Sequence, residues 1–208
     1  MDGINPRGGW IEVITGGMFS GKSEELIRRI RRAEIARQRT QIFKPAIDTR
    51  FDEKRIISRD NRELDAIAVS TAAELRGKVV LGVKVIGVDE VQFFDDHIVE
   101  VCMEMADAGV RVIVAGLDQD YLRRPFGPMP HLLAVAEYVS KMHAVCVRCG
   151  SPAHYTQRVA GGNSQIEIGD GSYEARCRMC YEPYRAVVIA DQSSERERET
   201  VGAGTGVE

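Results

Sequence analysis

The chain has 208 residues, of which 44% are hydrophobic, and it carries a formal net charge of −3. This length suits one moderate domain, or one domain with a small appendage, and the apolar content is ample for a core. The acidic balance gives no reason to expect nucleic acid or an anionic membrane as a partner, and no apolar run approaches the length of a membrane span.

The first ten residues and the five cysteines bear on the cellular compartment. The N-terminal sequence MDGINPRGGW lacks the basic and then apolar layout of a signal peptide. Without an export signal, cysteines indicate free thiols or metal ligands rather than disulfides. We therefore expect a cytoplasmic protein.

The chain begins with an expected flexible arm over residues 1–9, followed by a strand and a helix. Residues 10–14 alternate and end in an apolar pair, which predicts a short buried strand. Residues 22–38 carry apolar side chains near a helical period, at Leu26, Ile27, Ile30, Ala33 and Ile35. Between strand and helix lies GGMFSGKS, which fits the pattern G-x-x-x-x-G-K-[ST].

This motif predicts a loop that binds the phosphates of a nucleotide. Its glycines let the backbone turn tightly, so that N–H groups point at the phosphates, and the following helix adds its N-terminal dipole. Lys22 supplies a cation for the β- and γ-phosphates, and the Ser23 hydroxyl is a Mg²⁺ ligand. An accidental glycine-rich turn is the alternative, which the strand–loop–helix context disfavours. The predicted nucleotide-binding residues of the loop are Gly16, Gly17, Met18, Phe19, Ser20, Gly21, Lys22 and Ser23.

Further along the chain, apolar runs alternate with helical spacings. The predicted strands cover residues 40–45, 64–70, 83–88 and 110–118, and helices are predicted from Thr71 and over 95–109, with a polar excursion over 46–63. Strands that alternate with helices indicate an α/β fold with a parallel sheet. From Cys146 the sequence becomes polar, glycine-rich and cysteine-bearing, and the last stretch has almost no apolar residues. We therefore predict a nucleotide-binding domain over 10–143, a small domain over 144–190 and a disordered tail over 191–208.

An acidic pair follows the strand over 83–88. Asp89 and Glu90 are expected to face the crevice at the carboxyl end of the sheet, opposite the phosphate loop. An Asp at this point commonly holds Mg²⁺, and a neighbouring acid can accept a proton from, or orient, an attacking hydroxyl. The alternative is that the two acids merely begin a surface loop, and the phosphate loop favours the functional interpretation.

Two segments near the acidic pair suggest a pocket for a nucleobase. Gln92 offers an amide beside the aromatic residues Phe93 and Phe94, although aromatic residues at such positions belong more often to a core. The segment LDQDYLRRPFG over 117–127 follows the next buried strand and adds two aromatic residues. Its two arginines, Arg123 and Arg124, either balance phosphate charge or belong to a solvated loop.

Two C-x-x-C pairs predict a metal site. They comprise Cys146, Cys149, Cys177 and Cys180, and they place four thiolates around one tetrahedral ion, as in a structural zinc ribbon. Redox-active C-x-x-C pairs are the alternative, but these normally occur singly. The fifth cysteine, Cys102, lies on a helical apolar face and is expected to be buried.

Several segments together resemble the type II thymidine kinase family. They are GGMFSGKS, KPAIDTRF, VDEVQFF, AGLDQDYLRRPFG, KMHAVCVRCG and YEARCRMCY, in the expected order from about residue 10 to 188. The resemblance implies a RecA-like α/β domain with a zinc-bearing lasso domain, and phosphorylation of thymidine to dTMP by ATP and Mg²⁺. It also implies a cytoplasmic homotetramer that is subject to feedback inhibition by dTTP.

The resemblance assigns roles to individual residues. Glu90 corresponds to the family's base. Apart from the resemblance, Asp89 and Gln92 are also expected in the nucleotide site. The expected thymidine pocket comprises Met18, Phe93, Leu117, Tyr121, Phe126, Thr156 and, from the lasso QIEIGDGSY, the backbone of Ile166, Ile168 and Gly169, with Tyr173 near the sugar. Between Ile166 and Tyr173 the chain is one residue shorter than the family pattern.

Two other functions compete with a thymidine kinase. A P-loop ATPase whose zinc module binds nucleic acid is disfavoured because no basic stripe is present. A non-catalytic nucleotide sensor fits poorly with intact Lys22, Asp89 and Glu90.

A pocket that separates thymidine from deoxyuridine by one methyl group gains only about 1–3 kcal/mol, so some use of deoxyuridine is expected. Because the phosphate loop and the cysteines fall in different predicted domains, nucleotide binding is expected not to depend on the metal.

Overall fold

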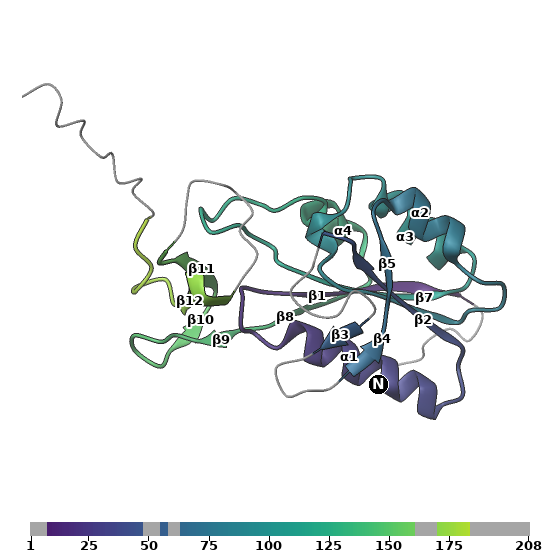
Figure 1. Ribbon diagram of the computed structural model, residues 1–208, viewed down its shortest axis with the longest axis horizontal. Coiled ribbons are helices and arrows are strands. Elements are labelled where there is room, and N and C mark those ends of the chain that lie inside the picture. Colours follow the sequence, from purple (N-terminus) through teal and green to yellow (C-terminus); the bar gives the residue numbers. More distant parts are fainter. Residues whose placement is uncertain (1–7, 48–54, 58–62, 161–169, 184–208) are drawn as a thin grey trace, which may run out of the picture.

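The computed structural model describes residues 8–47, 55–57, 63–160 and 170–183 (Figure 1). The expected tail over 191–208 and all but two residues of the expected arm over 1–9 lie outside the described residues. The same is true of Ile166, Ile168 and Gly169 of the expected lasso.

Six parallel strands form the central sheet, in the order β5-β2-β6-β7-β1-β8. The strands are β1 (Trp10–Thr15), β2 (Thr40–Pro45), β5 (Ile67–Val69), β6 (Val85–Val88), β7 (Arg111–Gly116) and β8 (Tyr138–Lys141). The continuous apolar runs of β6 and β7 are buried because helices cover both faces of the sheet. One strand, β7, separates β1, which leads into the phosphate loop, from β6, which leads into the acidic pair. The predicted α/β fold with a parallel sheet is confirmed.

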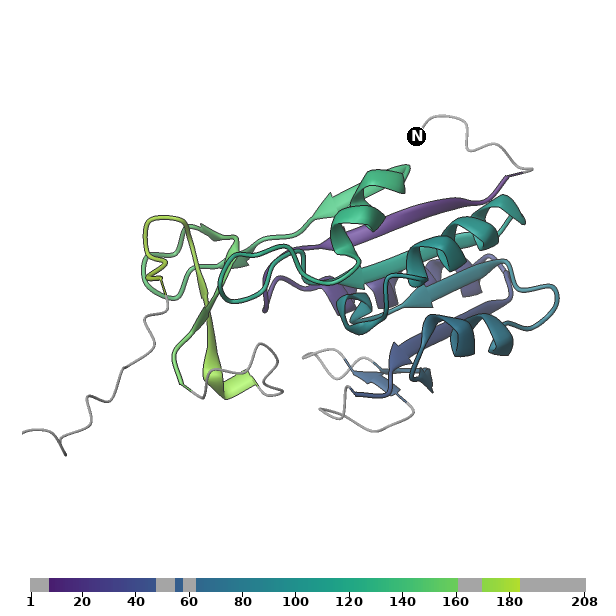
Figure 2. The same cartoon turned by 90° about the horizontal axis from the view of Figure 1, so that it is seen from above.

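Helices lie on both faces of the sheet. Figures 1 and 2 show α1 (Lys22–Ile35) on one face and α2 (Ala72–Lys78), α3 (Ile98–Asp107) and α4 (Met129–Val135) on the other. The predicted apolar stripe of α1 is buried as far as Ala33, whereas Ile35 is 82% exposed because the helix ends there. A Cβ at Gly87 of β6 would lie 3.0 Å from the Ile30 side chain, so the missing side chain lets α1 pack closely on the sheet.

Several segments differ from the sequence-based prediction. Residues 64–70, predicted as one strand, divide between β4 (Glu63–Asp65), which pairs with β3 (Arg55–Ile57), and β5, which joins the main sheet. The alternating pattern runs through both strands and therefore does not reveal the break between them. In addition, α4 and β8 occupy residues for which no element was predicted. The edge strand β8 is largely exposed, so it lacks the apolar pattern of a buried strand.

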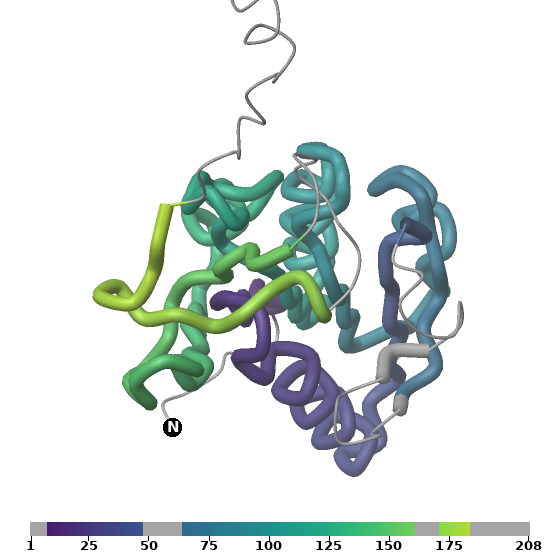
Figure 3. The backbone as a smooth tube through the Cα atoms, turned by 60° about the vertical axis from the view of Figure 1, so that its left-hand side comes forward, coloured from purple at the N-terminus to yellow at the C-terminus, as the bar shows by residue number. Residues whose placement is uncertain are grey.

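A smaller part with two antiparallel strand pairs follows β8. It contains β9 (Ala144–Val145), β10 (Pro152–Ala153), β11 (Tyr155–Arg158) and β12 (Tyr173–Arg176). Figure 3 looks onto this end of the molecule, where the purple chain that follows β1 lies among the green and yellow-green chain of this smaller part. Of the helices in the described ranges, none combines the length and the apolar character needed to cross a membrane.

Candidate active site and metal centre

The loops that follow β1, β6 and β7 meet at the carboxyl edge of the sheet. Parallel strands that are neighbours in a sheet end at the same edge, where α/β proteins bind their ligands. The three loops carry the phosphate-loop motif over 16–23, the acidic pair and the aromatic segment over 117–127. The structure therefore brings together the three segments that the sequence singled out for chemistry.

The phosphate loop turns sharply between β1 and α1. Gly16, Phe19 and Gly21 have positive φ angles of 143°, 67° and 81°, of which only the Phe19 value is unusual for its residue type. The Lys22 ammonium donates a hydrogen bond to the carbonyl oxygen of Gly17 at 2.8 Å, and the Ser20 hydroxyl donates to the same oxygen at 2.8 Å. Both bonds stabilise the tight turn of the loop, and they place the Lys22 ammonium against the loop backbone.

The acidic pair is fixed by local hydrogen bonds and by Gln92. The Glu90 backbone has a positive φ of 49°, and its N–H donates to Oδ1 of the buried Asp89 at 3.0 Å. The Gln92 amide nitrogen donates to Glu90 Oε2 at 2.5 Å, and its Oε1 accepts the Leu117 N–H at 3.0 Å. Gln92 is 2% exposed, so this bridge between the loops after β6 and β7 is shielded from water.

Two glycines make room for Gln92. A Cβ at Gly116 would lie 2.7 Å from Gln92 Oε1, and a Cβ at Gly127 would lie 2.3 Å from the Gln92 carbonyl oxygen. Neither distance is sterically possible without a shift. Gly116 thus leaves room for the Gln92 side chain, and Gly127 leaves room for the Gln92 backbone.

The aromatic residues expected near a nucleobase form two groups. Phe93 and Phe126 meet edge to face, with ring centroids 5.6 Å apart. Tyr121 and Tyr173 enclose Arg158, whose guanidinium lies 3.6 Å from the Tyr121 centroid and donates to the Tyr173 hydroxyl at 2.6 Å. Arg158 thus joins Tyr121 of the loop after β7 to Tyr173 of β12.

Arg158 is a candidate site residue that the sequence reasoning missed. It is 2% exposed and lies two residues after Thr156 on β11. Since side chains two apart on a strand share a face, the expected role of Thr156 was a signal that Arg158 faces the same region. Of the two arginines that the sequence did single out, Arg123 lies over the rings of Tyr155 and Tyr181, at 5.5 and 4.7 Å, and thereby joins the loop after β7 to the smaller part.

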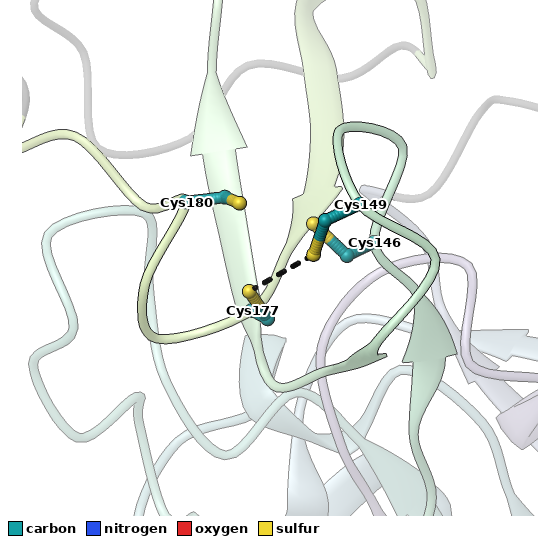
Figure 4. Close-up of side chains that lie close together, drawn as sticks. All are labelled: Cys146, Cys149, Cys177 and Cys180. Carbon is teal, nitrogen blue, oxygen red and sulfur yellow. Dashed lines mark hydrogen bonds between the residues drawn. The ribbon is translucent and has the colours of Figure 1, made fainter.

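The four cysteines of the C-x-x-C pairs converge (Figure 4). Their sulfur atoms all lie within 4.8 Å of one another, and those of Cys149 and Cys177 are 3.6 Å apart. All five cysteines of the chain lie in the described ranges, and each is a free thiol. Cys102 is buried in the core as expected, and burial raises the pKa of its thiol to about 12.

Hydrogen bonds shift the pKa values of Cys146 and Cys180 in opposite directions. Burial acts to raise the pKa of Cys146, but hydrogen bonds from the backbone N–H groups of Cys177 and Arg148 outweigh it and lower the pKa to about 6. Hydrogen bonds with Cys149 and Cys177 raise the pKa of Cys180 to about 12. One thiolate therefore forms readily, whereas four adjacent thiolates require a cation among them. Four sulfur donors with no open position fit a structural zinc site, and their joint convergence disfavours a single redox pair.

Comparison with known proteins identifies the family. The family model for thymidine kinase matches residues 9–181. The thymidine kinase of Bdellovibrio bacteriovorus is 50% identical over 192 residues, which cover 92% of this chain and 94% of that protein. The thymidine kinase of a Rhodothermus species is 51% identical over 178 residues, covering 85% of this chain and 83% of that protein, and the thymidine kinase of Bacteroides thetaiotaomicron is 49% identical over 176 residues, covering 84% and 88%.

Among solved structures, the cytoplasmic domain of the Thermomonospora curvata type VII secretion ATPase EccC aligns with 86% of this chain and 24% of its own chain. The sequence identity is 12% and the TM-score is 0.39, which is too low to bear on function. The family match, by contrast, spans the phosphate loop, the acidic pair and all four converging cysteines. The chain belongs to the thymidine kinase family.

Proposed function

We propose that this chain is an ATP-dependent thymidine kinase, which transfers the γ-phosphate of ATP to the 5′-hydroxyl of thymidine and releases dTMP and ADP. The observation that carries the proposal is the placement of Glu90, whose carboxylate is held by Gln92 at the sheet edge that also carries the phosphate loop. A phosphate donor and a proton acceptor on one edge are what transfer to a hydroxyl requires.

The loop over 16–23 is proposed to bind the ATP phosphates through its backbone N–H groups. Lys22 would exchange its bond with the Gly17 carbonyl for the β- and γ-phosphates, and it would follow the charge that develops during transfer. Ser23 and Asp89 supply the hydroxyl and carboxylate oxygens that would hold Mg²⁺ beside the phosphates. When bound, the ion neutralises phosphate charge.

Glu90 is proposed as the catalytic residue. Its carboxylate accepts the proton of the thymidine 5′-hydroxyl as the hydroxyl oxygen bonds to the γ-phosphorus. The bond from that phosphorus to the β,γ-bridging oxygen breaks, and ADP leaves with the electron pair. Because the transition state is loose, the orientation of the hydroxyl matters as much as basicity. Gln92, first assigned to the nucleotide site, is proposed instead to position Glu90, since its amide is engaged at both ends.

The thymidine pocket is proposed to lie between the aromatic residues after β6 and β7 and the strands of the smaller part. Its proposed members in the described residues are Met18, Phe93, Leu117, Tyr121, Phe126, Thr156 and Tyr173, with Arg158 added from the structure. The contacts of Tyr121 and Tyr173 with Arg158 support a common pocket. The proposed backbone contacts of Ile166, Ile168 and Gly169 with the thymine ring lie outside the described residues.

The remaining parts of the proposal rest on the family. A structural Zn²⁺ would be held by Cys146, Cys149, Cys177 and Cys180, and the convergence of their sulfur atoms supports this assignment. We also propose the division into a nucleotide-binding domain over 10–143 and a metal-binding domain over 144–190, a cytoplasmic homotetramer, and feedback inhibition by dTTP.

One assay tests the activity. ADP release from ATP and Mg²⁺ is measured with and without thymidine, and the nucleoside product is identified by mass. Thymidine-dependent ADP release with formation of dTMP is expected. Hydrolysis that needs no thymidine and is stimulated by DNA or RNA would instead favour an ATPase whose cysteine module binds nucleic acid.

A further inference from the structure

The phosphate loop lies directly against the smaller part of the molecule. The Met18 N–H donates to Thr156 Oγ1 on β11 at 3.0 Å. A Cβ at Gly16 would lie 2.3 Å from the Met142 carbonyl oxygen, and one at Gly17 would lie 3.2 Å from the His154 carbonyl oxygen. Consecutive loop residues thus touch the chain on either side of the first cysteine pair, although the sequence places the two regions in different domains.

Phe19 completes this contact. Its side chain packs against a small apolar cluster formed by Ala144, Cys146, Ala153, Ala175 and Cys177. Two of these residues are members of the converging cysteine set, so the aromatic ring of the phosphate loop rests on the core of the metal centre.

The backbone of Phe19 needs external support. Its φ of 67° lies in the left-handed region, which is unfavourable for a bulky residue. Such conformations persist where the surroundings determine them. At Phe19 such contacts include its packing on the cysteine cluster and the hydrogen bond of the preceding Met18 N–H to Thr156.

The cluster that supports Phe19 is itself too small to be stable by apolar burial. Three of its five buried members are alanines, and the strands around it are two to four residues long. Small units of this kind are usually held together by a metal. The four sulfur donors fit that requirement, so the order of the cluster depends on the ion that they would hold.

We propose that Phe19 couples the phosphate loop to the four-cysteine centre, so that metal binding and nucleotide binding strengthen each other. This inference rests on the proposed function, in which the loop over 16–23 binds ATP. It replaces the expectation that nucleotide binding is independent of the metal. Phe19 is a positioning residue in this scheme, because it acts through the loop backbone. Coupling between two sites is reciprocal, so ATP should protect the metal by the same factor by which the metal improves ATP affinity.

The test measures release of zinc from the full chain to a chromogenic chelator, with and without saturating ATP and Mg²⁺ and with no thymidine present. For the unchanged protein, ATP is expected to slow release by about fivefold or more, the usual lower range of coupling between sites. In Phe19→Ala, release without ATP should be faster, and saturating ATP should slow it little. The matched control is Met179→Ala. The Met179 side chain lies between two of the cysteines in sequence and is 90% exposed, so this variant should keep full protection by ATP.

Direct binding of a fluorescent ATP analogue to the zinc-loaded protein distinguishes failure of the proposed function from failure of the proposed coupling. If the unchanged protein does not bind the analogue, the proposed function fails. If it binds the analogue but ATP does not slow zinc release, or if ATP protects Phe19→Ala as well as the unchanged protein, the coupling is wrong. Should Phe19→Ala not fold by circular dichroism, Phe19→Leu replaces it. Leucine keeps part of the contact, so an intermediate protection supports the coupling, and unchanged protection overturns it.

Discussion

The Gln92 side chain and the Glu90 carboxylate form a hydrogen bond of 2.5 Å, while the other end of the same amide accepts the Leu117 N–H. Because Gln92 is buried and bonded at both ends, it has little freedom to move. The carboxylate is therefore held at a fixed distance from the loop after β7, which carries the proposed nucleoside pocket. A fixed carboxylate is valuable where orientation of the attacking hydroxyl limits the reaction.

The first prediction concerns Glu90. Glu90→Gln should lower kcat by about 100-fold or more, because the proton acceptor is lost while the shape is kept. Binding of thymidine and of a fluorescent ATP analogue should be little changed. Steady-state kinetics and equilibrium binding measure the two effects. Near-normal turnover would move the catalytic role to another carboxylate, and Asp48, which lies outside the described residues, would be the next to change.

The second prediction concerns Gln92. Gln92→Leu should lower kcat by roughly 10- to 100-fold with little change in KM for ATP, because the carboxylate is no longer oriented. The partly buried Leu117 N–H also loses its acceptor, which should lower the free energy of unfolding by about 1–3 kcal/mol. A variant with lower stability but normal kcat below its melting temperature would show that Gln92 is structural and does not position Glu90.

The third prediction concerns Lys22. Lys22→Ala should reduce kcat by about 100-fold or more, because it removes the charge proposed to stabilise the transferring phosphoryl group. ATP affinity should fall as well, and isothermal titration measures it directly. The exposed Arg32 in the last turn of the same helix serves as the control, since Arg32→Ala removes a charge of the same sign away from the loop. Equal losses in the two variants would contradict a specific role for Lys22.

The fourth prediction concerns the metal. Elemental analysis should find about one zinc per chain, as expected for a single site of four thiolates. Cys177→Ser should weaken zinc retention and thymidine binding together, because the site closes the base of the segment between Cys149 and Cys177, which is proposed to bind the thymine ring. Cys102→Ser, at the buried cysteine outside the cluster, is the control and should keep its zinc. Intact thymidine binding in a folded, metal-free Cys177→Ser chain would contradict this role of the metal.

The fifth prediction concerns Glu12, which accepts hydrogen bonds from Arg29 at 2.7 Å and from Arg111 at 2.6 Å. Burial acts to raise the pKa of Glu12, but the bonds from Arg111 and Trp10 outweigh it and hold the pKa below its ordinary value of 4.5. The unfolded chain therefore binds this proton more readily than the folded chain. The stabilisation of the folded chain by the ionised Glu12 carboxylate is complete above about pH 4.5. It is lost as the pH falls through the lower pKa of the folded state.

Glu12→Gln should accordingly lower the free energy of unfolding by about 1–3 kcal/mol at pH 7. The difference from the unchanged protein should shrink as the pH falls below 4.5. Urea titrations at a series of pH values measure this difference in the free energy of unfolding. A difference that stays constant down to pH 3 would mean that the Glu12 charge does not contribute to stability.

The sequence by itself determined the main elements and predicted the residues of the two candidate sites. The motif over 16–23, the buried strands and the two C-x-x-C pairs are local patterns, because tight turns, strand burial and metal chelation each impose fixed spacings on nearby residues. The parallel sheet follows from the alternation of strands and helices, which also places Asp89 and Glu90 at the sheet edge that carries the phosphate loop.

Only the tertiary structure decided how these parts meet. The bond from Leu117 to Gln92, the burial of Arg158 against Tyr121 and the packing of Phe19 on the cysteine cluster join residues 25 or more positions apart. No local period encodes such contacts, since they depend on how whole layers pack. The exposed edge strand β8 and the break between β4 and β5 were not predicted either. Both are defined by pairing with a neighbouring strand and not by an apolar pattern.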